Sequence, residues 1–416
     1  MKKIALKSKK GYKWEVLSLL WLAYFLNQAD RQIFSVVLPL VREDLKLTDT
    51  ELGLIASALV WTYGVLVPFA GFAGDRYSKK SIIGSSLMFW SVATMFTGMC
   101  HTLFQFVLLR GVATGGGEAF YAPSANALIS DEYKEKRSFA LAIHQTAVYF
   151  GIILSGLIAG YVAEAYGWRS AFYLFGGFGV LVSAIIFIRL KKDAPVQATE
   201  KIDVLVTAKQ IAKKPTVILL TVAFACMVFV NVGYLTWMPS LLVEKFGLSL
   251  TEAGFSAMFY HHLGAFIGVV FGGAIADKLA KSNPVNRLRL QGISLLAAAP
   301  FIYMIGASQT TMATFIALFI FGLFRGAYDS NIFASLFEVI KPEIKSSASG
   351  LMIMCAFLAG AFSPVILGML KPTFGLAAGL SWLWPSYFIG SVLIFIASVF
   401  TFNKDRVIIQ DLNISK

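Results

Sequence analysis

Three clusters of ionisable side chains interrupt stretches of sequence that are otherwise apolar. The members of these clusters are Asp30, Arg31, Arg110, Glu118, Arg325 and Asp329. Each would cost about 2.5–3.5 kcal/mol to place at the centre of a lipid bilayer, so each predicts a function. An arginine in such surroundings can bind an anion, and a buried carboxyl can take up or release a proton. The expected chemistry is reversible ion binding with no covalent step.

Helical spacing places most of these groups on common faces. The first stripe consists of Tyr24, Asn27, Gln28, Arg31 and Ser35, with Asp30 one residue off it. The second stripe consists of Arg110, Thr114, Glu118 and Tyr121. Between them, Gly115, Gly116 and Gly117 remove side-chain bulk where another group must approach closely. The third cluster consists of Arg325, Tyr328 and Asp329, with Asn331 nearby.

Coupled binding of an anion and a proton follows from placing arginines beside carboxyls. Desolvation and a nearby arginine act on a carboxyl in opposite directions, so such a group can change its protonation near neutral pH. If an anionic solute takes the arginine, the carboxyl loses its partner and prefers its protonated form. Solute and proton then load together, and the neutral cavity can close. The alternative is that the pairs merely join helices, above all Arg325 and Asp329, which are four residues apart.

The composition places these clusters in lipid. The 416 residues are 57% hydrophobic and 14% charged, with a mean hydropathy of +0.71. Apolar stretches of the length that crosses a bilayer recur along the whole chain. The expected spans are residues 14–40, 51–73, 81–100, 103–128, 137–162, 168–190, 216–240, 251–276, 288–307, 311–339, 346–370 and 381–402. The sequence therefore predicts an all-α integral membrane protein with twelve transmembrane helices.

The net charge of +13 follows this topology. Basic residues gather before the first span and after the second, sixth and eighth, while alternate loops are neutral or acidic. By the positive-inside rule both termini and the central loop are cytoplasmic, in the cell's inner (plasma) membrane. A basic face for nucleic acid is disfavoured because no soluble domain exists to present it.

The two halves of the sequence contain the same series of helix-end and capping motifs in the same order. The first span ends at Pro39 and the seventh at Pro239, and a capping sequence follows each, ending in Gly53 and in Gly254. Asp75-Arg76 matches Asp277-Lys278, and Arg110 matches Arg325. The expected domains are a six-helix bundle over residues 1–190, a cytoplasmic linker over 191–214, a second pseudo-symmetric six-helix bundle over 215–402 and a tail over 403–416. Parallel repeats of this kind place a solute site between the bundles, near the bilayer midplane.

Residues 71–83, GFAGDRYSKKSII, resemble the signature of the major facilitator superfamily between helices two and three. Gly167-Trp168-Arg169 and Arg110 resemble further recurrent features of that family, although Ser78 stands where the signature usually has glycine. The resemblance covers essentially the whole chain and implies the major facilitator fold. Asp75, Arg76 and Asp277 are then expected to form a conformational latch, with simple topology-setting charges as the alternative.

Asp30-Arg31 and Arg110 with Gly117-Glu118-Ala119 resemble the anion:cation symporter branch, which includes hexuronate, galactonate and sialin-type carriers. The spinster branch shares these features. The resemblance implies that Asp30 and Glu118 carry protons and that Arg31 and Arg110 hold the anion. Family members separate the arginine from the glutamate by seven residues, whereas this sequence has eight. Either a bulge absorbs the extra residue or Arg110 points elsewhere.

Weaker candidates for solute contact lie on other helices. They are Tyr24, Asn27, Gln28, Tyr121, Gln145, Tyr149, Asn231, Tyr234 and Tyr260, together with Arg325 and Asp329. His144 is equally compatible with a hydrogen bond to a neighbouring backbone carbonyl, and His261 and His262 accompany Tyr260 on the eighth span.

The sequence is compatible with three functions. The favoured one is proton-coupled symport of a small organic anion, a sugar acid such as a hexuronate, an aldonate or sialic acid, by alternating access. The alternative is a spinster-like or multidrug-type exporter of lipids or drugs. An integral-membrane enzyme is the remote alternative, because the sequence has no Ser/His/Asp set, HExxH motif or phosphate loop. We expect a monomer in the bilayer with no cofactor or metal, with H⁺ as the coupling ion and Na⁺ as the open alternative.

Overall fold

The fold was examined in a computed structural model that describes residues 10–134, 136–191, 211–341 and 344–407. The first half consists of α1 (Lys10–Leu45), α2 (Asp49–Arg76), α3 (Lys79–Thr97), α4 (Leu103–Phe106), η1 (Val107–Thr114), α5 (Gly115–Ala119), α6 (Tyr121–Glu132), α7 (Arg137–Tyr166) and α8 (Trp168–Arg189). The second half consists of α10 (Pro215–Phe246), α11 (Leu250–Ala280), α12 (Val285–Ala307), α13 (Thr311–Val339), α14 (Lys345–Gly360), α15 (Phe362–Ser381), α16 (Trp384–Ile396), η3 (Ala397–Thr401) and α17 (Phe402–Asp405). The described residues contain no strand.

These elements make up twelve crossings, because α4–η1–α5–α6, α14–α15 and α16–η3–α17 each act as one. Among the described residues, nine helices are long and apolar enough to cross a membrane. The remaining three crossings are α1, α3 and the composite fourth. Of these, α1 carries Asp30 and Arg31 at mid-length, which lowers its hydropathy, whereas the fourth crossing is divided into four short elements. The predicted all-α membrane fold is confirmed.

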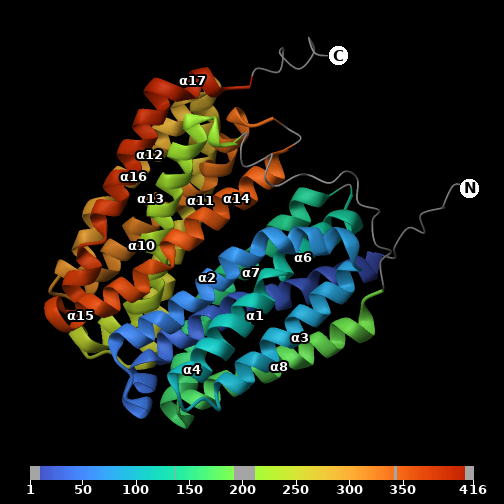
Figure 1. The fold of residues 1–416 in the computed structure, drawn as a ribbon, viewed down its shortest axis with the longest axis vertical. Coiled ribbons are helices and arrows are strands. Elements are labelled where there is room, and N and C mark those ends of the chain that lie inside the picture. Colours follow the sequence, from blue (N-terminus) through green and yellow to red (C-terminus); the bar gives the residue numbers. More distant parts are fainter. Residues whose placement is uncertain (1–9, 135, 192–210, 342–343, 408–416) are drawn as a thin grey trace, which may run out of the picture.

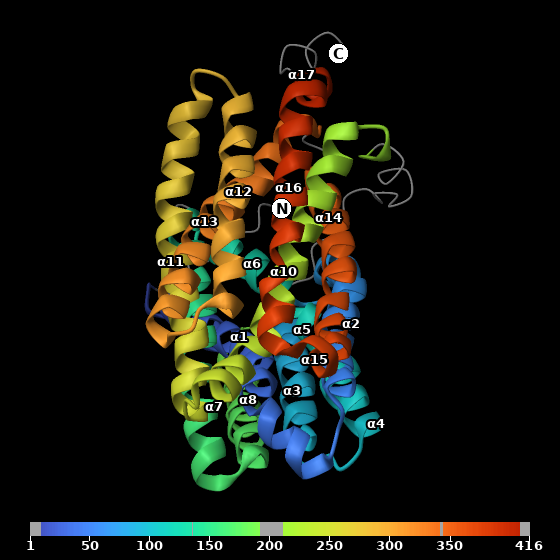
Figure 2. The same ribbon diagram turned by 90° about the vertical axis from the view of Figure 1, so that its left-hand side faces the viewer.

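The helices form two groups that diverge in space (Figure 1). Helices α1–α8 form the first bundle and α10–α17 the second, and the start of α1 and the end of α17 lie on the same side, here called the terminal side. In the second bundle α16 packs against both α10 and α12 (Figure 2). The bundles meet away from the termini, where α7 contacts α11 and α2 contacts α15. We call this the far side.

The repeat seen in the sequence reappears in local structure. Thr48 and Ser249 each accept a hydrogen bond from the backbone N–H of the glutamate three residues later, and that glutamate accepts one in return. These two capping boxes begin α2 and α11. Gly167 and Gly375 adopt nearly the same conformation, with φ of 82° and 77° and ψ of 157° in both. Only glycine reaches it without strain. Gly167 separates α7 from α8, and Gly375 kinks α15 shortly before α16 begins.

Charged side chains join the bundles on the far side. The Lys371 ammonium lies 3.0 Å from Asp49 Oδ1 in the first bundle and 2.6 Å from Glu244 Oε1 in its own. At the other seam, Glu164 accepts hydrogen bonds from the backbone N–H of Leu250, at 2.6 Å, and from the Thr251 hydroxyl. A carboxylate from one bundle thus caps the positive end of a helix in the other.

Glycines let the two bundles touch backbone to backbone on the far side. A Cβ on Gly254 would lie 2.5 Å from the carbonyl oxygen of Gly156, and a Cβ on Gly53 would lie 2.4 Å from that of Pro364. One turn further out, Gly160 meets Leu250 and Gly368 meets Asp49 in the same way. In both seams, the second contact lies four residues from the first along each of the two helices. The two seams are therefore pseudo-symmetric copies of a single contact.

Candidate functional site

A cavity of about 480 Å³ lies between the bundles. Its walls come from α1, α2, η1 and α7 on one side and from α10, α11, α13 and α14 on the other. The predicted site residues that line it are Gln28, Arg31, Arg110, Gln145, Asn231, Arg325 and Asp329. Most of the remaining wall is apolar, so the cavity has the mixed character expected of a small-molecule site.

Arg31 and Glu118 form an ion pair at the cavity wall. Arg31 Nε lies 2.7 Å from Glu118 Oε2, and the guanidinium stacks over the Tyr63 ring at 4.1 Å from its centroid. Glu118 is buried, while the Arg31 side chain keeps 18% of its surface exposed. Within the described part of the chain, Arg31 Nη2 and Glu118 Oε1 have no hydrogen-bond partner. The arginine therefore has a free donor and the glutamate a free acceptor.

Arg110 holds the backbone of α1. Its Nη2 donates to the carbonyl oxygens of Asp30, at 2.7 Å, and Arg31, at 3.0 Å. The Asp30 carboxylate faces α3, where its Oδ2 accepts a hydrogen bond of 2.8 Å from the Thr94 hydroxyl. Arg110 thus positions Arg31, and its buried Nη1 has no partner among the described residues.

A π-helix brings Arg110 and Glu118 to the same side of the fourth crossing. Element η1, Val107–Thr114, contains Arg110, and the Thr114 hydroxyl donates to the carbonyl of Leu109, five residues earlier. Wider turns of this kind absorb an extra residue. Both side chains consequently reach α1 despite their eight-residue separation. The helix breaks again at Phe120, because Pro123 has no N–H to offer the carbonyl of Ala119.

The glycines of this crossing serve helix packing. A Cβ on Gly115 would lie 2.7 Å from the carbonyl oxygen of Leu59 in α2, and one on Gly117 would lie 2.9 Å from the Cβ of Trp90 in α3. The close approach expected from Gly115, Gly116 and Gly117 is therefore to neighbouring helices, which fixes Glu118 against the wall.

The second bundle contributes its own charged pair. Arg325 Nε lies 3.2 Å from Asp329 Oδ2, one turn along α13, and Arg325 Nη1 lies 3.0 Å from His261 Nε2. Because arginine only donates, that histidine nitrogen must be the acceptor. Arg325 and Asp329 keep 16% and 27% of their side-chain surfaces exposed, so both reach the cavity while bound to each other.

The sequence profile of the Major Facilitator Superfamily matches residues 20–364, which is most of the chain. The chain belongs to this superfamily. It is 27% identical over 387 residues to the hexuronate transporter of Bacillus subtilis, covering 88% of this chain and 90% of that one. It is also 28% identical over 390 residues to protein spinster homolog 1 of Xenopus tropicalis, and the match covers 87% of this chain and 74% of that one.

Among solved structures, a bacterial homologue of the human lysosomal transporter spinster, inward-facing and unoccupied, superposes with a TM-score of 0.84. The two share 21% sequence identity, and the match covers 96% of this chain and 99% of that one. This likeness establishes the fold. The protein is accordingly a multi-pass membrane transporter of the facilitator type and not an enzyme.

Several tyrosines that the sequence assigned to solute contact lie inside the bundles of this facilitator. Tyr121 donates to the carbonyl of Leu20 and lies 3.1 Å from His144 Nε2. Tyr24 stacks on the same histidine, with ring centroids 4.6 Å apart. None of these three rings lines the described cavity walls. They form a polar packing core within the first bundle.

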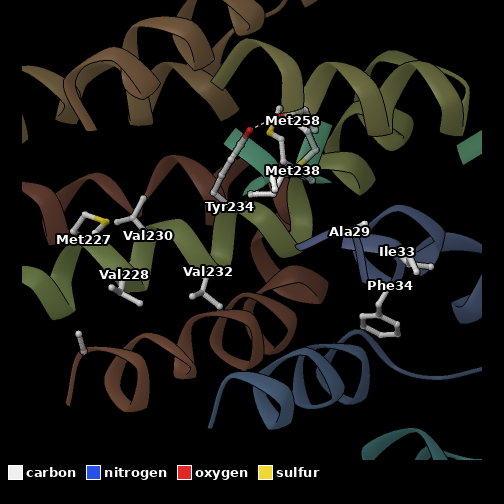
Figure 3. Packing of buried hydrophobic residues seen from close by; sticks show 14 of the residues in the cluster. Ala29, Ile33, Phe34, Met227, Val228, Val230, Val232, Tyr234, Met238 and Met258 are labelled. Atoms are coloured by element: carbon white, nitrogen blue, oxygen red, sulfur yellow. Dashed lines mark hydrogen bonds between the residues drawn. The ribbon is translucent and has the colours of Figure 1, made fainter. Parts of the chain in front are cut away.

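In the second bundle Tyr234 points toward α11 beside Met258 and donates to the carbonyl of Ala257 (Figure 3). Tyr260 stacks on Phe315, with centroids 4.5 Å apart. Tyr149, on α7 of the first bundle, packs edge-on against His262 of α11 at 6.4 Å. These rings, like Asn27 in the first bundle, are not among the described cavity-lining residues. Asn27 accepts a hydrogen bond of 2.9 Å from Gln28.

The residues predicted to form a latch lie on the terminal side. Asp277 pairs with Arg287 at 2.9 Å, and Arg287 also lies 3.4 Å from Glu338 of α13. The side chains of Asp75 and Arg76 lie outside the described residues, although the backbone of α2 extends to Arg76. The latch role remains a prediction.

Three contributors to this facilitator's site were not singled out from sequence. Tyr63 carries the Arg31 guanidinium, Thr94 binds Asp30 and Gln32 lines the cavity. Tyr63 and Thr94 each lie in a helix that carries several other hydroxyl side chains, so one more hydroxyl gives no signal. Gln32 adjoins Arg31 but falls outside the polar stripe.

Proposed function

We propose that the protein is a proton-coupled symporter of a small organic anion, with a sugar acid such as a hexuronate, an aldonate or sialic acid as the solute. In this proposal Arg31 binds the anion and Glu118 carries the proton. Arg110 holds the binding helix in place, and Asp30 is a second candidate proton carrier. Gln28, Gln145 and Asn231 supply hydrogen bonds to hydroxyl groups, since all three line the same cavity.

The observation that carries the proposal is the Arg31–Glu118 pair. Its 2.7 Å contact joins a buried carboxylate to an arginine that also reaches the cavity. An anion arriving at the exposed part of the Arg31 guanidinium competes with Glu118 for that group. A carboxylate that loses its partner in a buried site binds a proton instead of remaining charged. Anion and proton therefore load as a neutral pair.

Coupling follows from the difference between loaded and half-loaded states. A cavity that holds the anion without the proton contains an unpaired buried charge, and closing it in low dielectric is strongly unfavourable. A cavity that holds both, or neither, is neutral and can reorient. The bundles then exchange access between the two sides of the membrane. The hexuronate transporter relative supports an organic anion as the solute.

We infer that the protein lies in the inner (plasma) membrane with its terminal side facing the cytoplasm. We also propose that it works as a monomer. Basic residues concentrate on the terminal side, including Lys80, Arg189, Lys214 and Lys278. The far side carries the acidic residues Glu43, Asp44, Glu164 and Glu244. This asymmetry satisfies the positive-inside rule.

The test is uptake into proteoliposomes under an imposed pH gradient. Radiolabelled glucuronate, galactonate and N-acetylneuraminate are offered with and without a protonophore, and in parallel under a sodium gradient. Accumulation that the protonophore abolishes supports H⁺ coupling and identifies the solute. Accumulation driven by the sodium gradient alone would assign Na⁺ as the coupling ion. Absence of uptake for all three solutes would overturn the sugar-acid assignment.

A spinster-like exporter of lipids or drugs is the second candidate. It is favoured by the spinster relative and by the apolar part of the cavity wall, which includes Phe34, Met227, Phe333 and Phe357. Binding of a lysolipid or a hydrophobic dye, unaffected by added sugar acids, would favour it.

We predict that Arg31→Gln weakens binding of the anion about 100-fold, because the variant removes the charge that faces the cavity while keeping a polar side chain. Isothermal titration of the purified protein measures this loss. The control is Gln28→Ala on the same wall, for which we expect a change of only a few fold. Equal effects of the two variants would contradict a special role for Arg31.

A further inference from the structure

A second cation faces the same cavity from the opposite bundle. Arg325 on α13 and Arg31 on α1 both line it, and each is bound to a carboxylate, Asp329 and Glu118 respectively. Their side chains are 16% and 18% exposed. The two pairs thus present similar arrangements, an arginine braced by its own acid and open toward the solute. A solute with two carboxylates can neutralise both of them.

The charges at mid-membrane balance. The six ionisable groups of the three clusters comprise three arginines and three carboxylates. When all are ionised the empty cavity is neutral. Every negative charge that enters therefore needs one proton if the loaded cavity is to remain neutral. Arg110 is bound to backbone carbonyls and does not compete strongly for solute, which leaves Arg31 and Arg325 as the two anion positions.

The wall around Arg325 suits a hydroxylated chain. His262 lines the cavity and its Nδ1 lies 2.8 Å from the carbonyl oxygen of Met258, which can only accept. The other ring nitrogen is then an acceptor for a solute hydroxyl. Asn231 also lines the cavity, and its Oδ1 has no partner among the described residues. A cation flanked by two acceptors matches a carboxylate next to hydroxyl groups.

We propose that the preferred solute is a polyhydroxylated dicarboxylate, with one carboxylate bound by Arg31 and the other by Arg325. This inference rests on the proposed function and specifies its substrate class. The solute bridges α1 of the first bundle and α13 of the second, so both bundles close on it. As each arginine turns to the solute, Glu118 and Asp329 each take up a proton, and two protons travel with one dianion.

The experiment compares glucarate with gluconate, which differ only in having a carboxylate or a hydroxymethyl group at one end. For the unmodified protein in proteoliposomes we expect an apparent KM at least about tenfold lower for glucarate. A given pH gradient should accumulate glucarate with two protons per solute and gluconate with one. Simultaneous measurement of pH and solute fluxes gives this ratio.

The diagnostic variant is the double replacement Arg325→Gln with Asp329→Asn, which removes the cation together with its counter-charge and leaves no unpaired buried charge. We expect gluconate uptake with one proton to be retained and glucarate uptake to fall below it, because a single proton leaves the second carboxylate of glucarate uncompensated in the closed cavity. The control is Arg289→Gln on the exposed face of α12, which should leave the ratio of glucarate to gluconate uptake unchanged.

Three results would overturn the dianion inference. Gluconate or glucuronate uptake without glucarate uptake would overturn it while leaving the anion symporter intact. A parallel loss of glucarate and gluconate uptake in the double variant, with the glucarate preference retained, would assign Arg325 and Asp329 to helix packing. Absence of uptake for every sugar acid would overturn both this inference and the proposed function.

Discussion

Glu118→Gln is expected to keep exchange of solute across the membrane and to lose uphill accumulation. Glutamine can still accept a hydrogen bond from Arg31, so the binding helix keeps its position. It cannot take up a proton, so solute movement no longer draws on the pH gradient. One pH unit supports an about tenfold gradient of a solute coupled to one proton, and this ratio should fall to about 1. Counterflow and pH-driven uptake in proteoliposomes measure the two activities separately.

The control for this variant is Glu43→Gln, an exposed carboxylate on the far side that contacts neither Arg31 nor the cavity. It should leave both activities at the level of the unmodified protein. Accumulation by the Glu118→Gln variant that matches the unmodified protein would sink the proton role of Glu118. Loss of both exchange and accumulation would instead assign Glu118 to the folding of the site.

Gly254→Leu is expected to hold the protein open on the far side and to abolish uptake. Even the first side-chain atom would lie 2.5 Å from the carbonyl oxygen of Gly156, and backbone cannot move aside as a flexible side chain can. The bundles must therefore separate at this seam. We expect uptake to fall at least about 100-fold, while solute offered from the far side still binds.

Alkylation of a single cysteine measures the opening. Val36→Cys places it against Gly254, at a buried position, after Cys100, Cys226 and Cys355 are replaced by serine. A membrane-impermeant maleimide should react faster in the Gly254→Leu background. The matched control is Gly177→Leu, because a Cβ at Gly177 meets nothing within 4 Å. Uptake and alkylation rates equal to those of this control would show that the seam does not close the far side.

Much of the architecture follows from the sequence. Apolar run lengths and the alternation of basic loops predict the twelve crossings, and the matched caps at Thr48 and Ser249 predict the repeat. The cost of burying charge identified Arg31, Arg110, Arg325 and Asp329, all of which line the cavity. These signals are strong because lipid penalises each deviation separately.

Other features depend on tertiary packing and could not be predicted from the sequence. The eight-residue spacing left two readings open, and only the position of η1 shows that Arg110 and Glu118 both meet α1. Helical periodicity predicts a face but not which neighbour covers it. Tyr121 and Tyr234 consequently looked solute-facing, although they bind backbone carbonyls inside their bundles.

The paired glycine seams bear on what must not pass through the protein. Because Gly53 and Gly254 meet their partners as copies of one contact, rocking of the bundles separates both seams in the same movement. We expect no lasting state in which one seam has parted while the terminal side is still open. We therefore expect that no continuous chain of water molecules forms across the bilayer, so protons have no path along which to leak. In the proposed symport, the proton gradient is then discharged only by complete, loaded cycles.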